Sequence, residues 1–375
     1  MTSQLQAGPD PEMLSQLQKA GFREPNAAGM MLYDIGQRAS ELASEQKPLP
    51  CLLEAIVDSY DPNRALNNLY SLLTQENQDT TASLLHLFAR RPEETNALVG
   101  ICAGSQPLSM GIIQDPAFVL SLFSNASWRS FGSVETLSER LSSMIDQTGS
   151  FEEGMVALRR FKREEYLHIA ICDLMKLMET PDILRRLSDV ADVCLQGACD
   201  LSVRDLEARH GQPMLPDGQP SGFAVIGMGK LGGQELNFSS DIDILYVCDS
   251  PKGRTSGSGL STYEYYPKLA RMITDAIGRI TSEGFVFRVD LRLRPEGRAG
   301  DLAGAVESYR RHYLSRGQIW ERQALIKARP LAGSRIVGQQ FLDAVEPFVF
   351  HPESDPLILD DINRNREKIA HALLE

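Results

Sequence analysis

The chain has 375 residues, of which 42% are hydrophobic and 23% charged, as in a globular protein of two or three domains. Acids outnumber bases 50 to 38, and the net charge of −12 argues against a dedicated nucleic-acid-binding protein. Apolar runs stay below the roughly 18 residues that a membrane span requires, and the first residues lack the features of a secretory signal. We therefore expect a cytoplasmic protein with neither a nucleic-acid nor a membrane partner.

The six cysteines and six histidines are scattered along the chain. No CxxC pair and no HExxH spacing occurs, which argues against a zinc or other histidine-based metal site. We expect the cysteines to be small buried hydrophobic residues in a reducing compartment rather than disulfide partners.

Residues 1–150 carry helical punctuation and no repeat. Pro92 and the acids that follow it suit a first helical turn, and Pro116 interrupts the next apolar segment. The clearest helix comes later: Thr180 is a good N-cap, Pro181 suits the first helical position, and apolar residues recur at helical spacing as far as Leu201. A turn-rich break over 210–222 ends it.

Beyond that break the hydrophobic period changes to that of strands. Residues 223–228 form a short apolar run that ends in glycines, and residues 241–247 alternate, with Asp241 and Asp243 on one face. Residues 251–261 read as a loop, and residues 266–280 as a helix that ends near Gly284.

Residues 285–293 alternate again and predict a second strand. Asp290, Arg292 and Arg294 then share the face opposite the apolar residues. After Pro295 the pattern is helical to the end of the chain, and it stops inside an uncapped helical stretch over 365–375. We therefore expect the sequence to be a fragment of a longer protein.

The acids of the two predicted strands carry the chemistry. Asp241 and Asp243 project from one face of a strand, so their carboxylates repel each other unless a cation lies between them. Mg²⁺, bound through oxygen, is the natural partner. With Asp290 from the second strand, three carboxylates can hold two metal ions roughly 3.5–4 Å apart, the arrangement used for phosphoryl or nucleotidyl transfer.

A D-x-D pair alone is more often two solvated acids. Here the glycine-rich segment just upstream can present backbone N–H groups, at Gly229 for example, to phosphate oxygens, and Ser239 and Ser240 add hydroxyls. The same glycines match G-x-G-x-x-G, but a dinucleotide site needs its acid about 20 residues further on, after a crossover helix. No P-loop motif is present, so we reject both readings.

The segment over 285–335 is basic, with eleven Lys or Arg and five acids. Arg292 and Arg294 lie beside Asp290, where a guanidinium can bind a phosphate bidentately. Gln323 and Lys327 are one helical turn apart on a face shared with Trp320. A solvated basic helix with a core tryptophan explains that second pattern equally well.

Three segments together resemble a known family: 227–247 (GMGKLGGQELNFSSDIDILYV), 287–304 (FRVDLRLRPEGRAGDLAG) and 320–333 (WERQALIKARPLAG). They are similar to the glutamine synthetase adenylyltransferase family of the polymerase-β-like nucleotidyltransferase superfamily. Its members are long bacterial proteins with two nucleotidyltransferase domains. One domain attaches AMP to a tyrosine of glutamine synthetase, and the other removes it by phosphorolysis and releases ADP.

The resemblance implies an α+β fold, in which a mostly helical chain carries a small polymerase-β-like sheet core flanked by helical bundles. It implies an N-terminal helical region over 1–150, a nucleotidyltransferase domain over 151–335 and a truncated helical region from 336. It places the metal acids at Asp241, Asp243 and Asp290. The superfamily's glycine–serine phosphate motif has no literal match, so phosphate contact falls to backbone N–H groups, Lys230 and Ser240.

The spelling of 227–243 resembles the N-terminal, adenylyl-removing half of family members, and the long helical leader after Met1 agrees with that position. The implied substrates are phosphate and AMP-modified glutamine synthetase, with Mg²⁺ as cofactor and ADP as product. The PII signalling protein is a further implied partner of the full-length enzyme. Two alternatives stay open: adenylylation from ATP, and a non-catalytic effector-sensing module, against which the three acids count.

Overall fold

The computed structural model describes residues 9, 11–42, 48–75, 77–124, 126–350, 363–364 and 366–367, and it has the predicted α+β fold, mostly helical with a small sheet. The chain divides into two compact units. The first contains residues 1–131 and 163–183, and the second contains residues 132–162 and 184–375.

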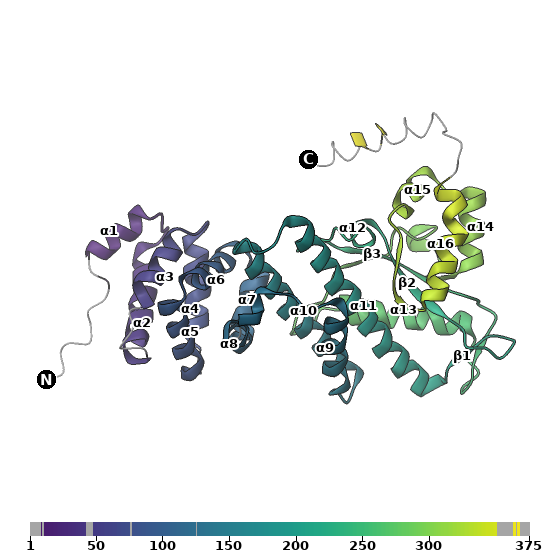
Figure 1. Cartoon of the computed structure of the whole chain (residues 1–375), viewed down its shortest axis with the longest axis horizontal. Coiled ribbons are helices and arrows are strands. Elements are labelled where there is room, and N and C mark those ends of the chain that lie inside the picture. The colour runs from purple at the N-terminus through teal and green to yellow at the C-terminus, as the bar shows by residue number, and fades with distance from the viewer. Residues whose placement is uncertain are drawn as a thin grey trace. The chain divides into compact units, whose positions relative to one another are not determined.

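The first unit is helical, as its sequence predicts (Figure 1). Pro92 occupies the first turn of its helix and Pro116 begins another, because a proline has no N–H to leave unsatisfied there. The helices are α1 (Pro11–Lys19), α2 (Pro25–Leu42), α3 (Pro48–Val57), α4 (Pro62–Leu73), α5 (Gln78–Arg90), α6 (Pro92–Gly104), α7 (Gln106–Gln114) and α8 (Pro116–Ser124), followed by the 3-10 turn η1 (Ala126–Arg129).

Three further helices precede the strands in the chain: α9 (Val134–Asp146), α10 (Phe151–Leu174) and α11 (Thr180–His210). The predicted helix from Thr180 is confirmed and continues past Leu201 to His210. Within the second unit, α9 packs closely on α11. A Cβ added at Gly197 of α11 would lie only 2.8 Å from a methyl group of Leu141 on α9. The position therefore favours glycine.

A five-stranded sheet forms the centre of the second unit, in the order β5-β3-β2-β7, with β6 also paired to β3. Strands β2 and β7 run antiparallel to their neighbours, whereas β5 and β6 run parallel to β3. The strands are β2 (Phe223–Gly227), β3 (Ile242–Cys248), β5 (Val289–Asp290), β6 (Ala303–Ala305) and β7 (Arg329–Gly333). A separate two-stranded sheet joins β1 (Pro213–Met214) to β4 (Arg254–Thr255).

Helices cover the sheet, so β2 and β3 are almost wholly buried (Figure 1). One core gathers Leu245 of β3 with Tyr309, Phe341 and Phe348 from α14 (Val306–Arg316) and α16 (Arg335–Val349). Helix α16 packs on this core. On α13 (Thr262–Gly278), the ring of Tyr266 stacks on Phe223.

The strand predicted over 285–293 is wrong in length, since only β5 pairs in the sheet. The predicted alternation also fails, because Val286 is fully buried and Phe285 is 41% exposed. The reason is local. The amides of Val286 and Phe287 both donate to the carbonyl of Ile277 at the end of α13, so this backbone caps a helix and is not free to extend the sheet.

The prediction of helix throughout after Pro295 is also wrong, since β6, β7 and the 3-10 turn η2 (Gly297–Ala299) lie there. Helix α15 (Ile319–Leu325) ends before Lys327, so Lys327 does not share a helical face with Trp320. Trp320 is 43% exposed and not a core residue. Of the helical stretch predicted over 365–375, only Arg366 and Glu367 are described, and both are helical.

Among the described residues, no helix combines the length and the apolar character that a membrane span requires. Five of the six cysteines are buried, as expected, whereas Cys51 is partly exposed.

Candidate active site

Strands β3 and β5 bring the predicted acids together. Asp243 on β3 lies directly opposite Asp290 on β5 in the parallel register. Asp241 immediately precedes β3, and its side chain is 47% exposed, whereas that of Asp290 is 15% exposed. The adjacency of two short parallel strands therefore gathers carboxylates that are distant in sequence.

The pKa of the Asp243 carboxyl is raised by its surroundings. Its partial burial, and then the negative charges of Asp290 and Asp241, raise the pKa of its carboxyl to about 6. Arg292 and Lys230 lower this pKa, but by less. The carboxylate thus lies in an excess of negative charge, which a bound cation would neutralise.

Two arginines form ion pairs with Asp241 and Asp290. Arg288 donates to the Asp241 carboxylate and, over 2.8 Å, to the carbonyl of Ser239. Arg292 donates from Nη2 to Asp290 Oδ2 over 2.5 Å and from its backbone N–H to Oδ1 over 2.8 Å. Arg292 follows β5 in a turn, so its pairing with Asp290 replaces the shared strand face that the sequence predicts.

Arg294 is used differently. Its guanidinium donates to the carbonyl oxygens of Leu291, over 2.9 Å, and Gly300, over 3.3 Å. These contacts join both ends of the segment over 291–300. The structure therefore places Arg292 on the acid cluster and Arg294 on the backbone of this loop.

The glycine turn, residues 228–236, contains the short helix α12 (Gly229–Gly232) and lies against Asp243. Gly229 has a φ of +54°, and a Cβ there would lie 2.7 Å from Asp243 Oδ2. A Cβ at Gly232 would lie 2.2 Å from the carbonyl oxygen of Lys327. Only glycine fits both positions, and at Gly229 the left-handed backbone adds a second reason.

The remaining predicted residues lie around this turn. Lys230 Nζ donates to Ser240 Oγ over 3.3 Å, and Ser240 Oγ donates to Asn237 Oδ1 over 2.5 Å. Lys327 Nζ pairs with Glu235 Oε2 at 2.5 Å, and both side chains are half exposed. Ser239 contributes its carbonyl, rather than its hydroxyl, to Arg288.

Sequence reasoning assigned no role to Arg288 or Glu235. A signal existed for Arg288, because it stands two residues before Asp290 and the predicted alternation put both on one face. Glu235 gave no signal, since its partner Lys327 is 92 residues away in the chain.

The donor chemistry at this cluster suits a hard divalent cation such as Mg²⁺, which prefers carboxylate oxygens. In the part of the chain that the structure describes, no three His, Cys, Asp or Glu side chains are already arranged to hold a metal ion. Two of the acids are held by Arg288 and Arg292 instead. The residues fit the ion once these guanidiniums, which are both mostly exposed, turn away; the exposed Arg288–Asp241 pair contributes only about 0–1 kcal/mol.

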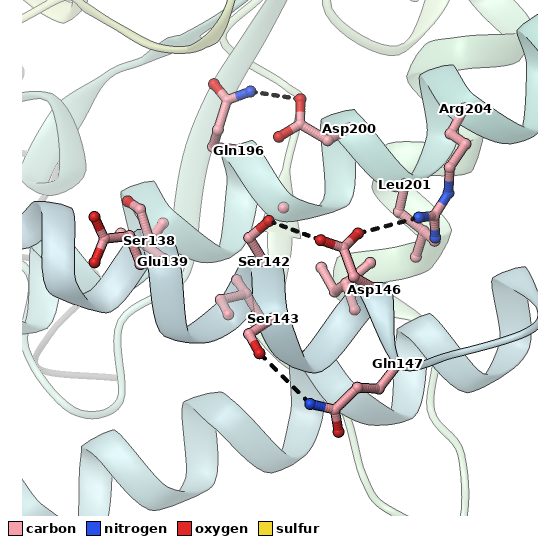
Figure 2. A pocket seen from close by; sticks show the side chains of 14 residues that line it. Ser138, Glu139, Ser142, Ser143, Asp146, Gln147, Gln196, Asp200, Leu201 and Arg204 are labelled. Carbon is pink, nitrogen blue, oxygen red and sulfur yellow. Dashed lines mark hydrogen bonds and ion pairs between the residues drawn. The ribbon is translucent and has the colours of Figure 1, made fainter.

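A cavity of about 870 Å³ lies elsewhere in the same unit, between α9 and α11. Figure 2 shows its polar side chains pairing with one another: Asp146 accepts from Ser142 over 3.4 Å and pairs with Arg204 at 3.5 Å. None of the predicted site residues lines it. Its volume alone gives no reason to assign it chemistry.

Comparison with known proteins gives consistent matches. The family model described as glutamate-ammonia ligase adenylyltransferase matches residues 95–344. A protein of Mesorhizobium japonicum is 39% identical over 248 residues, covering 64% of this chain and 25% of the relative. A protein of Brucella suis is 33% identical over 317 residues, 83% of this chain and 32% of the relative.

A third relative, from Nitrosococcus oceani, is 31% identical over 331 residues, 87% of this chain and 32% of the relative. All three relatives are named bifunctional glutamine synthetase adenylyltransferase/adenylyl-removing enzymes. The matched parts cover between a quarter and a third of these relatives' own length.

Proposed function

The chain belongs to the glutamate-ammonia ligase adenylyltransferase family, and we propose that it is an adenylyl-removing nucleotidyltransferase module of that family. Its proposed reaction is the phosphorolysis of AMP-tyrosine on glutamine synthetase. An oxygen of inorganic phosphate attacks the AMP phosphorus, and the phosphorus–tyrosine oxygen bond breaks. The tyrosine oxygen takes up a proton, and the products are ADP and unmodified glutamine synthetase.

One observation carries the choice of nucleotidyl transfer. Asp243 lies beside Asp290 and Asp241, with the glycine turn packed on its carboxylate. Carboxylates that gather beside a glycine-rich backbone suit a cation and phosphate groups at the same place. A sensing module would need no such cluster, which disfavours the non-catalytic alternative.

The direction rests on the sequence of the glycine turn and β3. The segment over 227–243 is spelled like the adenylyl-removing half of family members rather than the adenylylating half. The charges agree with this choice, since a phosphate nucleophile needs cationic partners and Lys230, Arg292 and Lys327 surround the acids and the turn. Adenylylation from ATP remains the competing direction, and the same cluster serves it.

We propose that Asp241, Asp243 and Asp290 hold Mg²⁺, which when bound neutralises the charge that develops on the transferred phosphoryl group. Arg292 then exchanges part of its contact with Asp290 for a phosphate oxygen. Lys327 exchanges Glu235 for phosphate in the same way, and the N–H groups at the start of α12, with Lys230 and Ser240, orient the phosphates. Arg294 holds the loop over 291–300 and contacts no substrate.

The partners follow from the proposed reaction. Glutamine synthetase is the protein substrate, and the PII signalling protein is a proposed effector of the longer family members. The mostly buried thiols of this chain suit a reducing compartment, so we propose the cytoplasm as the place of action.

Two incubations test the proposal. AMP-modified glutamine synthetase with phosphate and Mg²⁺ should yield ADP, whereas unmodified glutamine synthetase with ATP and Mg²⁺ should gain no AMP. The Asp243→Asn variant is the matched control and should abolish ADP formation. Robust labelling in the second incubation with no ADP in the first would reverse the proposed direction, and no product in either would refute the enzymatic assignment.

A further inference from the structure

Arg329, the first residue of β7, contacts the glycine turn through two of its backbone carbonyl groups. Its Nε donates to the carbonyl of Gly232 over 3.3 Å, and its Nη2 donates to the carbonyl of Leu231 over 3.2 Å. The same guanidinium pairs with both carboxylate oxygens of Asp192 on α11, at 2.6 and 3.1 Å. One side chain thus joins the edge strand, the long helix and the turn.

Helix α11 holds the rest of the turn directly. Ser188 Oγ accepts from the backbone N–H of Leu236 over 3.1 Å in a buried contact. Asp189 Oδ1 accepts from the side chain of Gln234 over 3.5 Å. Gln234 has a φ of +55°, an unfavourable value for a residue with a side chain, so contacts such as these must stabilise it.

The turn is also tightly packed at two of its glycines. Gly229 lies against the Asp243 carboxylate, and Gly232 against the backbone of Lys327, so close that a Cβ would clash at either place. The contacts with Arg329, Ser188 and Asp189 add to this close packing and fix where the turn lies relative to Asp243.

We propose that Arg329 is a positioning residue that holds the glycine turn against Asp243 and so keeps the N–H groups at the start of α12, those of residues 229–231, placed for the phosphates of a nucleotide. The part that concerns nucleotide rests on the function proposed above, whereas the part that concerns the turn does not. Arg329 contacts none of Asp241, Asp243 and Asp290, and we expect it to contact no substrate. It acts on the turn through the carbonyl groups of Leu231 and Gly232.

The geometry makes arginine specific at this position. The planar guanidinium satisfies a bidentate carboxylate on one side while Nε and Nη2 reach two carbonyl oxygens. A lysine keeps the positive charge for Asp192 but cannot make both sets of contacts. Arg329→Lys therefore removes the hold on the turn while retaining the counter-charge of the largely buried Asp192.

The first readout is amide hydrogen exchange of the metal-free protein, measured by mass spectrometry. In Arg329→Lys we expect peptides covering 228–236 to exchange at least threefold faster, with peptides of α13 unchanged. Arg204→Lys is the matched control, since Arg204 pairs with Asp146 across α9 and α11 and contacts no part of the turn. Unchanged exchange over 228–236 in Arg329→Lys would overturn the proposal.

The second readout is binding of Mg·ADP by calorimetry. Arg329→Lys should weaken binding roughly fivefold to tenfold and raise the KM for phosphate more than it lowers kcat, while Arg204→Lys matches the wild type. Faster exchange with unchanged ADP affinity and KM would overturn the positioning role. If wild type binds no ADP and forms none, the proposed function fails, and the exchange result still decides whether Arg329 fixes the turn.

Should Arg329→Lys fail to fold, Ser188→Ala tests the same hold from α11, since it removes the acceptor of the Leu236 amide. It should accelerate exchange over 228–236 and weaken Mg·ADP binding in the same direction. Wild-type behaviour in both measurements would contradict the proposal.

Discussion

Asp243→Asn should stabilise the metal-free protein while it abolishes turnover. The carboxylate of Asp243 is partly buried and repelled by Asp290 and Asp241, which raises the pKa of its carboxyl to about 6. An asparagine has nearly the same volume and no charge, so it escapes this repulsion. The same change removes the negative charge with which Asp243 would bind a metal ion, so turnover is lost.

The size of the gain follows from the pKa. A rise from the ordinary value near 4 to about 6 corresponds to at most about 3 kcal/mol of unfavourable free energy for the charged form. Solvent screens this half-buried carboxylate, so we expect a gain of about 1 kcal/mol. In a folding unit of this size, that raises the Tm by about 2–4 °C.

The pH dependence of the stability shows whether the charge of Asp243 is the cause of the gain. Because the folded protein binds the Asp243 proton more tightly than the unfolded chain does, wild-type stability falls as the pH rises from about 4 to about 6. The advantage of Asp243→Asn should therefore be complete at pH 8 and absent at pH 4. Thermal unfolding followed by circular dichroism in a chelating buffer measures both.

Asp241→Asn is the matched control. Asp241 is half exposed and already paired with Arg288, so its loss should leave the Tm unchanged or lower it slightly. A Tm of Asp243→Asn at or below that of the wild type at pH 8 would refute the reasoning. So would an equal gain at pH 4.

Three further predictions concern single side chains. Arg292→Lys loses the bidentate contact and should lower the rate of ADP formation by about 10²–10³. Arg294→Lys should leave the dependence of the rate on phosphate concentration unchanged and lower the Tm. The reverse pattern in steady-state kinetics would exchange the roles of the two arginines. Gly229→Ala should cost about 1–2 kcal/mol and most of the activity, because the φ is +54° and the new methyl meets Asp243; wild-type Tm and turnover would argue against the packing of the turn. Phe341→Ala should cost about 3–5 kcal/mol by denaturant unfolding, since the ring is fully buried between α16 and the sheet, and a loss under 1 kcal/mol would contradict that core.

Periodic segments could be predicted from the sequence. The apolar stripe after Thr180 gives α11, and the apolar run over 223–228 gives β2, because in both the pattern follows the burial. The proximity of Asp243 and Asp290 was also expected, since it needs only that two strands be neighbours.

Long-range pairing and loop geometry could not be predicted. Strand β7 has only five residues, includes Pro330 and shows no alternation, so only its pairing with β2 identifies it as a strand. The segment over 285–288 has a strand-like pattern, yet its amides cap α13. Arg329 belongs to a motif visible in the sequence, but its partners lie about 97–137 residues away.

Radiolabelled inorganic phosphate tests the central claim most directly. Incubated with AMP-modified glutamine synthetase, Mg²⁺ and this chain, the label should appear in the β-phosphate of ADP, in an amount equal to the AMP lost from tyrosine. The Asp243→Asn variant should transfer none. Release of unlabelled AMP would indicate hydrolysis, and retention of AMP on the tyrosine beside an active full-length control would contradict the adenylyl-removing assignment.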